Sequence, residues 1–104
     1  MVSPDELLIP LPTLVKRIHA INHGWKLAQR LFSTTSPLAE RLRQAKTDLQ
    51  LYLLAVYRDR VRLEPDPAEA EAAYSLCLIE PVAGHRDAAH IPKGLVKPYL
   101  GEAQ

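Results

Sequence analysis

Apolar residues recur every three or four positions along much of the first 62 residues, which is the period of an α-helix. In residues 12–32 this stripe consists of Leu14, Ile18, Ile21, Trp25, Ala28 and Phe32. In residues 37–62 it consists of Leu38, Leu42, Ala45, Leu49, Tyr52 and Val56. The pattern therefore predicts two amphipathic helices, each with one face buried.

The short segment between these helices predicts an antiparallel hairpin. Ser36 can cap the second helix, and Pro37 suits its first turn. A loop this short places consecutive helices side by side. Gly24 could end one helix and start another at Trp25, but the apolar stripe stays in phase across it. We therefore expect one continuous first helix, bent or straight.

A third helix is predicted over residues 67–79. Asp66 can cap it, Pro67 can open it, and Glu69 can complete a capping box. Residues 74–79 could instead form a strand. Residues 1–11 are expected to be an irregular lead-in and residues 81–104 an irregular tail. The predicted fold is thus all-α: one domain of 104 residues, with a helical hairpin, a shorter third helix and a tail.

Residues 51–57 are apolar on every side of the second helix, so two helices alone cannot bury them. Either the third segment or another subunit must cover them. We expect a partner interface there, and a tendency of the isolated chain to self-associate. The residues expected to form this interface are Leu51, Leu54 and Tyr57.

The first helix contains no acidic residue, and its basic side chains follow one face. The five residues on that face are Lys16, His19, His23, Lys26 and Arg30. At about 100° per residue they lie roughly 160° from the apolar stripe. Such a positive face attracts polyanions, of which phosphate backbones are the most common.

Further cations extend this basic character along the second helix, and we expect them to contact nucleic acid as well. They are Arg41, Arg43, Lys46, Arg58, Arg60 and Arg62. The last three could instead complement the dipole of the helix C-terminus. Residues 7–62 carry ten Lys and Arg against three acids, whereas residues 63–104 carry three against seven. This asymmetry indicates an electrostatic partner, or neutralisation of the basic hairpin by the acidic segment within one fold.

No arrangement of residues indicates catalysis, a cofactor or a metal. His19 and His23 have the spacing of two metal ligands, but they stand in a row of cations, which opposes a metal ion. A third ligand could come from His85, His90 or Cys77 only if the fold brings one of them close. His90 and the following Lys-Gly resemble a phosphotransfer motif, but Pro92 would break the required helix. Cys77 lies in an apolar run, where a thiol is usually inert. We expect a protein that is not an enzyme.

The N-terminal residues MVSPDELLIPLP lack the basic start of a signal peptide, and no apolar run is long enough to span a membrane. A single cysteine fits a reducing compartment. We therefore expect a cytoplasmic protein.

In size, expected helical architecture and basic surface, residues 12–80 resemble the small helical subunits of CRISPR surveillance complexes. The residues that carry the likeness are Lys16, Lys26, Arg30, Arg41, Arg43, Lys46 and the 58–62 cluster. This resemblance implies a non-catalytic subunit that holds single-stranded or hybrid nucleic acid by its backbone, beside other protein subunits. The alternative is a protein–protein adaptor that binds an acidic surface and no nucleic acid.

Overall fold

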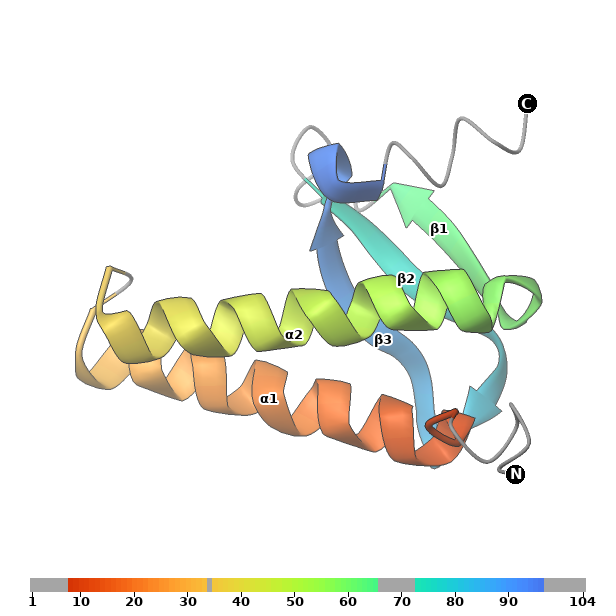
Figure 1. Cartoon of the computed structure of the whole chain (residues 1–104), viewed down its shortest axis with the longest axis horizontal. Helices are drawn as coiled ribbons and strands as arrows, with labels where there is room; N and C mark the ends of the chain where they lie inside the picture. The colour runs from red at the N-terminus through yellow and green to blue at the C-terminus, as the bar shows by residue number, and fades with distance from the viewer. Residues whose placement is uncertain (1–7, 34, 66–72, 97–104) are drawn as a thin grey trace, which may run out of the picture.

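Two helices are followed by a three-stranded antiparallel sheet in the computed structural model of the chain (Figure 1). The structure describes residues 8–33, 35–65 and 73–96. Its elements are α1 (Leu11–Leu31), α2 (Pro37–Val56), the 3-10 helix η2 (Arg58–Arg60), β1 (Val61–Pro65), β2 (Ala73–Val82) and β3 (His85–Pro92). The expected all-α fold is therefore wrong, and the chain is an α+β protein.

The helical hairpin is confirmed. Helix α1 is continuous through Gly24, and it packs antiparallel against α2 (Figure 1). Ser36 Oγ accepts a hydrogen bond of 3.1 Å from the backbone N–H of Ala39, as expected of an N-cap. The local signals of capping and periodicity were sufficient to place this part of the fold.

The second helix is shorter than expected: α2 ends at Val56 and not at residue 62. The chain then turns through η2 and enters β1, where Val61 and Leu63 face inward between exposed Arg62 and Glu64. This alternation has the period of a strand rather than a helix. β1 pairs with β2, with Arg62 opposite Cys77.

The third helix predicted over residues 67–79 is also wrong, because residues 73–82 form strand β2. Tyr74, Leu76 and Leu78 point to the core, while Ser75 and Cys77 lie on the other face of the sheet. The predicted cap at residues 66–69 lies outside the described residues. The strand alternative for residues 74–79 is the correct one.

The predicted irregular tail contains strand β3. Residues 83 and 84 join β2 to β3 in a two-residue turn, with φ of 52° at Ala83 and 82° at Gly84. Positive φ at both positions suits the right-handed twist of a hairpin. Residues 93–96 then form a helical turn, and residues 97–104 lie outside the described part.

The hydrophobic core lies between one face of the sheet and the open end of the hairpin, where α1 begins and α2 ends (Figure 1). Its largest fully buried apolar side chains are Leu14, Val15, Ile18, Leu53, Leu54, Leu76, Ile91 and Val96. The sheet therefore covers much of the apolar stretch 51–57. The other end of the hairpin, where α1 ends and α2 begins, extends beyond the sheet (Figure 1).

The buried face of α2 differs from the predicted stripe. Leu38 is exposed, and the rest of that stripe is only half-buried. The buried positions of α2 are Ala39, Lys46, Thr47, Gln50, Leu53 and Leu54, a face turned roughly 100° from the predicted one. Because α2 contacts both α1 and β3, it buries two sides, and the periodicity indicated only one of them.

Candidate interaction surface of the hairpin

The outer face of α1 carries four basic residues that reach solvent: Lys16, His23, Lys26 and Arg30, here called the basic ridge. Its ends lie fourteen positions apart in the sequence, which corresponds to about 21 Å along a helix. No acid lies on α1, and no ridge residue forms an ion pair with an acid within residues 8–33, 35–65 and 73–96. The ridge therefore presents positive charge that the described residues do not neutralise.

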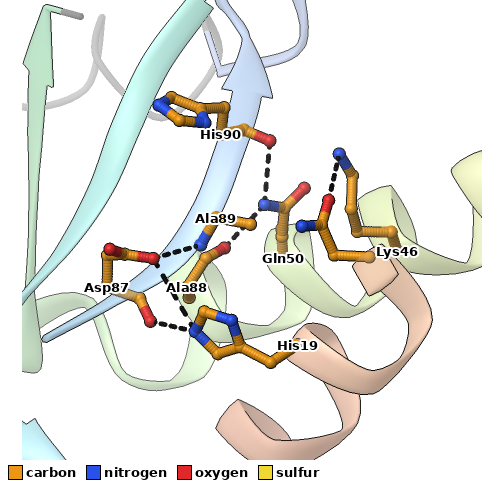
Figure 2. Close-up of polar contacts among 8 residues, drawn as sticks. His19, Lys46, Gln50, Asp87, Ala88, Ala89 and His90 are labelled. Atoms are coloured by element: carbon orange, nitrogen blue, oxygen red, sulfur yellow. Dashed lines mark hydrogen bonds and ion pairs between the residues drawn. The ribbon is translucent and has the colours of Figure 1, made fainter. Parts of the chain in front are cut away.

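His19, the fifth residue expected on this face, turns toward β3 instead (Figure 2). Its Nε2 atom lies 2.5 Å from the backbone oxygen of Asp87 and 3.7 Å from the carboxylate of the same residue. Its ring stacks on that of His85, with 3.8 Å between ring centroids and 11° between the planes. His19 thus connects α1 to the sheet, and we exclude it from the ridge.

Gln50 makes the second polar connection between hairpin and sheet. Its side chain is fully buried, and Nε2 donates hydrogen bonds of 2.7 Å to the Ala88 oxygen and 3.0 Å to the His90 oxygen (Figure 2). β3 is irregular here, with φ of 65° at Ala89, whose N–H donates to the Asp87 carboxylate at 2.9 Å. The buried Gln50 Oε1 atom has no hydrogen-bond partner. Gln50 therefore fixes the path of β3 across the hairpin.

Lys46 is only 5% exposed and points back to α1. Its Nζ atom donates to Asn22 Oδ1 at 3.3 Å (Figure 2). The same atom lies 4.2 Å from the ring centroid of Trp25. Trp25 is half-buried, less than its place in the predicted stripe implied. Lys46 was expected to contact nucleic acid, but its burial removes it from the accessible cations.

The other expected cations are exposed, apart from half-buried Arg43, but they do not extend the ridge as one surface. Arg43 donates to Glu40 at 3.1 Å, and Arg62 donates to Glu64 at 3.4 Å. Arg41 lies on the exposed side of α2. Arg58, Arg60 and Arg62 follow the end of α2, in η2 and β1, so they do not occupy the last turn of that helix.

The expected partner interface is largely internal. Leu54 is 1% exposed, and Leu51 and Tyr57 are half-buried against the core. Tyr57 also donates a 2.6 Å hydrogen bond from its hydroxyl to the Ile9 backbone oxygen. The sheet and the segment before α1 therefore contact the residues for which the sequence predicts a partner interface.

A different set of apolar residues is exposed, at the end of the hairpin that extends beyond the sheet. These are Leu27 (42% exposed), Leu31 (65%), Phe32 (64%) and Leu38 (49%), here called the hairpin tip. The apolar periodicity predicts that Phe32 and Leu38 are buried, and it includes neither Leu27 nor Leu31. The available signal was Leu27 and Leu31 among the polar positions of α1, outside its apolar stripe.

Among the described residues, no group of three or more His, Cys, Asp or Glu is arranged to hold a metal ion. Burial, followed by a hydrogen bond to Glu64, raises the pKa of Cys77 to about 11, so its thiol stays protonated at neutral pH. The same hydrogen bond, with the charge of Arg62, lowers the pKa of Glu64. His90 lies on β3 and not on a helix.

Comparison with protein-family models, with curated proteins and with solved structures finds no match to this chain. Neither helix of the described part is long and apolar enough to cross a membrane. The basic ridge and the hairpin tip are therefore the two features that bear on function.

Proposed function

We propose that this chain is a small, non-catalytic, cytoplasmic subunit of a nucleoprotein assembly, and that its basic ridge binds the phosphate backbone of a nucleic acid. One observation carries the proposal. The solvent face of α1 presents Lys16, His23, Lys26 and Arg30 without an acid on the same helix.

The geometry of the ridge suits contact with a backbone rather than with bases. Successive ridge residues are three to seven positions apart, or about 5–10 Å along the helix axis. A single strand or a groove edge of duplex presents phosphates at comparable intervals, so one strand can meet several cations. Contacts to phosphates fix position and orientation but carry no sequence information. We therefore expect binding that is similar for unrelated sequences.

The test compares charge reversals at matched exposure. Lys16→Glu and Lys26→Glu each change the net charge by two units on the ridge, and Arg86→Glu makes the same change on exposed β3. Binding of labelled single-stranded and duplex RNA and DNA is measured by anisotropy across a series of salt concentrations. Each lost phosphate contact should flatten the slope of log affinity against log salt by about 0.7 on single strands or 0.9 on duplex.

We expect both ridge variants to weaken binding and flatten this slope, while Arg86→Glu leaves the slope unchanged. All three should keep the stability of the wild type within about 0.5 kcal/mol, because the changed side chains are exposed. If the ridge variants bind with the slope of the wild type, the cations are only solvated and the proposal is wrong. If the three reversals act equally, the attraction follows net charge rather than the ridge.

The second candidate is a protein–protein adaptor that binds no nucleic acid. The observation in its favour is the exposed hairpin tip, because nucleic-acid binding does not require three exposed leucines. Under this function the wild type would show no affinity for any of the four nucleic-acid probes, alone or within its assembly.

The likeness to small subunits of CRISPR surveillance complexes depended in part on an all-helical architecture over residues 12–80. Since residues 61–65 and 73–82 form strands, that part of its support is lost. The proposed function therefore rests on the basic ridge alone.

A further inference from the structure

The hairpin tip is an apolar surface without a covering element among the described residues. Its four side chains lie within about two helical turns of the loop that joins α1 to α2, at the end of the hairpin away from the sheet (Figure 1). Each of the four is 42–65% exposed, although large apolar side chains are usually buried. Exposed apolar residues that gather at one place on a monomer frequently mark a binding site.

The charges around the tip are mainly positive. Arg30 precedes Leu31 on α1, and Arg41 follows Leu38 by about one turn on α2; both are exposed. The only acid on the first turns of α2 is Glu40, and its carboxylate accepts a hydrogen bond from Arg43 at 3.1 Å. A partner at this surface must therefore be apolar in part and gains from negative charge.

Three kinds of occupant fit these features poorly. A second copy would bring a second set of arginines against the first, and like charges oppose such pairing. A membrane would have to receive the turn itself, and the exposed hydroxyl groups of Ser33 and Thr35 would lose their water on entering lipid. Nucleic acid could bind the arginines, but it would leave the exposed leucines without apolar contacts.

We propose that the hairpin tip binds an amphipathic, acidic helical segment of another protein. Its apolar side chains would pack on Leu31, Phe32 and Leu38, and its carboxylates would meet Arg30 and Arg41. Binding of an amphipathic helix by its apolar face is a common mode of peptide recognition. This goes beyond the proposed function, because it concerns an apolar surface that shares only Arg30 with the basic ridge, and it holds whether or not the basic ridge binds nucleic acid.

The test uses designed peptides of about 18 residues with leucine or phenylalanine at positions i, i+3, i+4 and i+7. One peptide carries glutamates on the remaining positions, and a second carries lysines there. A third has the composition of the acidic peptide with its apolar residues scrambled. Binding is measured by anisotropy of the labelled peptide at low and high salt.

Two variants of the full chain locate the site. Leu31→Ser together with Phe32→Ser removes apolar surface from the tip, and the control Ile79→Ser removes an exposed apolar side chain (55%) from β2. Arg41→Glu tests the electrostatic part. Circular dichroism and urea unfolding verify that each variant is folded, which we expect because all of these side chains lie on the surface.

The acidic amphipathic peptide should bind the wild type, and the double tip variant should weaken that affinity about tenfold or more. Ile79→Ser should leave the affinity unchanged, and Arg41→Glu should weaken it chiefly at low salt. The lysine and scrambled peptides should bind much more weakly. Nucleic-acid affinity of the Leu31→Ser, Phe32→Ser variant should equal that of the wild type, which separates this test from that of the basic ridge.

The proposal is wrong if the acidic peptide does not bind, or if it binds the double tip variant as well as the wild type. Equal binding of the lysine peptide would mean that the tip selects no charge. Two further results would assign a different occupant: tip-dependent binding to vesicles of anionic lipid, or a dimer in sedimentation that the double tip variant abolishes.

Discussion

Gln50 offers the sharpest test of how the hairpin holds the sheet. The β2–β3 register pairs His90 with Ser75 and Asp87 with Cys77, so two residues of β3 lie against one residue of β2. At this bulge the strand ladder is interrupted, and Gln50 Nε2 supplies hydrogen bonds to two carbonyl oxygens. The change Gln50→Leu keeps a similar volume and removes both donors.

The magnitude follows from the polar atoms that change partners. Each carbonyl oxygen that loses a buried donor costs about 1–3 kcal/mol. The substitution also removes Gln50 Oε1, which is buried without a hydrogen-bond partner and costs a similar amount in the wild type. Two carbonyl oxygens lose a hydrogen bond and one unpaired oxygen is removed, so the net destabilisation is about 1–3 kcal/mol. The midpoint of thermal unfolding should fall by roughly 5–15 °C.

Gln50→Glu adds a test with a different dependence on pH. A carboxylate at this buried position cannot donate to the two carbonyls, so the folded state favours the protonated form and its pKa rises. The unfolded chain releases this proton near the ordinary pKa of glutamate. The deficit in stability relative to the wild type should therefore be small at low pH and grow as the pH rises above about 4.5.

Urea unfolding followed by circular dichroism measures both effects, with equal m-values showing that the same transition is compared. The reasoning is refuted if Gln50→Leu is as stable as the wild type. It is also refuted if the deficit of Gln50→Glu does not change with pH.

Three further predictions follow from single positions. Gly24→Ala should stabilise the chain by about 0.5–1 kcal/mol in urea unfolding, because the added methyl group would lie 3.9 Å from Leu42 and α1 is continuous there; a loss of stability would contradict this. His19→Ala should cost about 1–2 kcal/mol of stability and leave nucleic-acid affinity unchanged, because the His19 side chain contacts β3. Unchanged stability with a lower nucleic-acid affinity would mean that His19 belongs to the basic ridge. Iodoacetamide at pH 8 should alkylate Cys77 about 100-fold more slowly than an unfolded control, because its pKa is about 11 and thiolate is scarce; equal rates by mass spectrometry would refute this.

The hairpin could be predicted from sequence because its signals are local. The start of α2 depends on Ser36 and Pro37, and α1 depends on a periodic stripe, so neither requires knowledge of distant residues. The strands depend on pairing between distant segments. The side chains of residues 61–64 face the core and the solvent in alternation, which is the period of a strand. The helical pattern of the preceding residues continues in phase into this segment and obscures the change from helix to strand.

The surface was less predictable than the helices because it depends on where the sheet lies. Lys16, Lys26 and Arg30 are exposed as expected, but His19 and Lys46 have the same residue types and spacing and are turned inward. Nothing local distinguishes the two groups, since the difference comes from β3 packing beside α1 and from α2 burying two sides. For the same reason the exposed hairpin tip became evident only once the extent of the sheet was known.

The extension of the hairpin beyond the sheet divides each helix into two halves that should differ in amide hydrogen exchange. Val15, Ile18 and Leu53 lie in the core, so amides near them should exchange only when the whole protein unfolds. Around Leu31 and Leu38, α1 and α2 contact only each other within the part of the chain that the structure describes, and the small residues Ala28 and Ala39 are buried there. Amides there should exchange through local opening at a lower free energy. A molecule that binds this end should slow that exchange, so the exchange rate of these amides measures its binding.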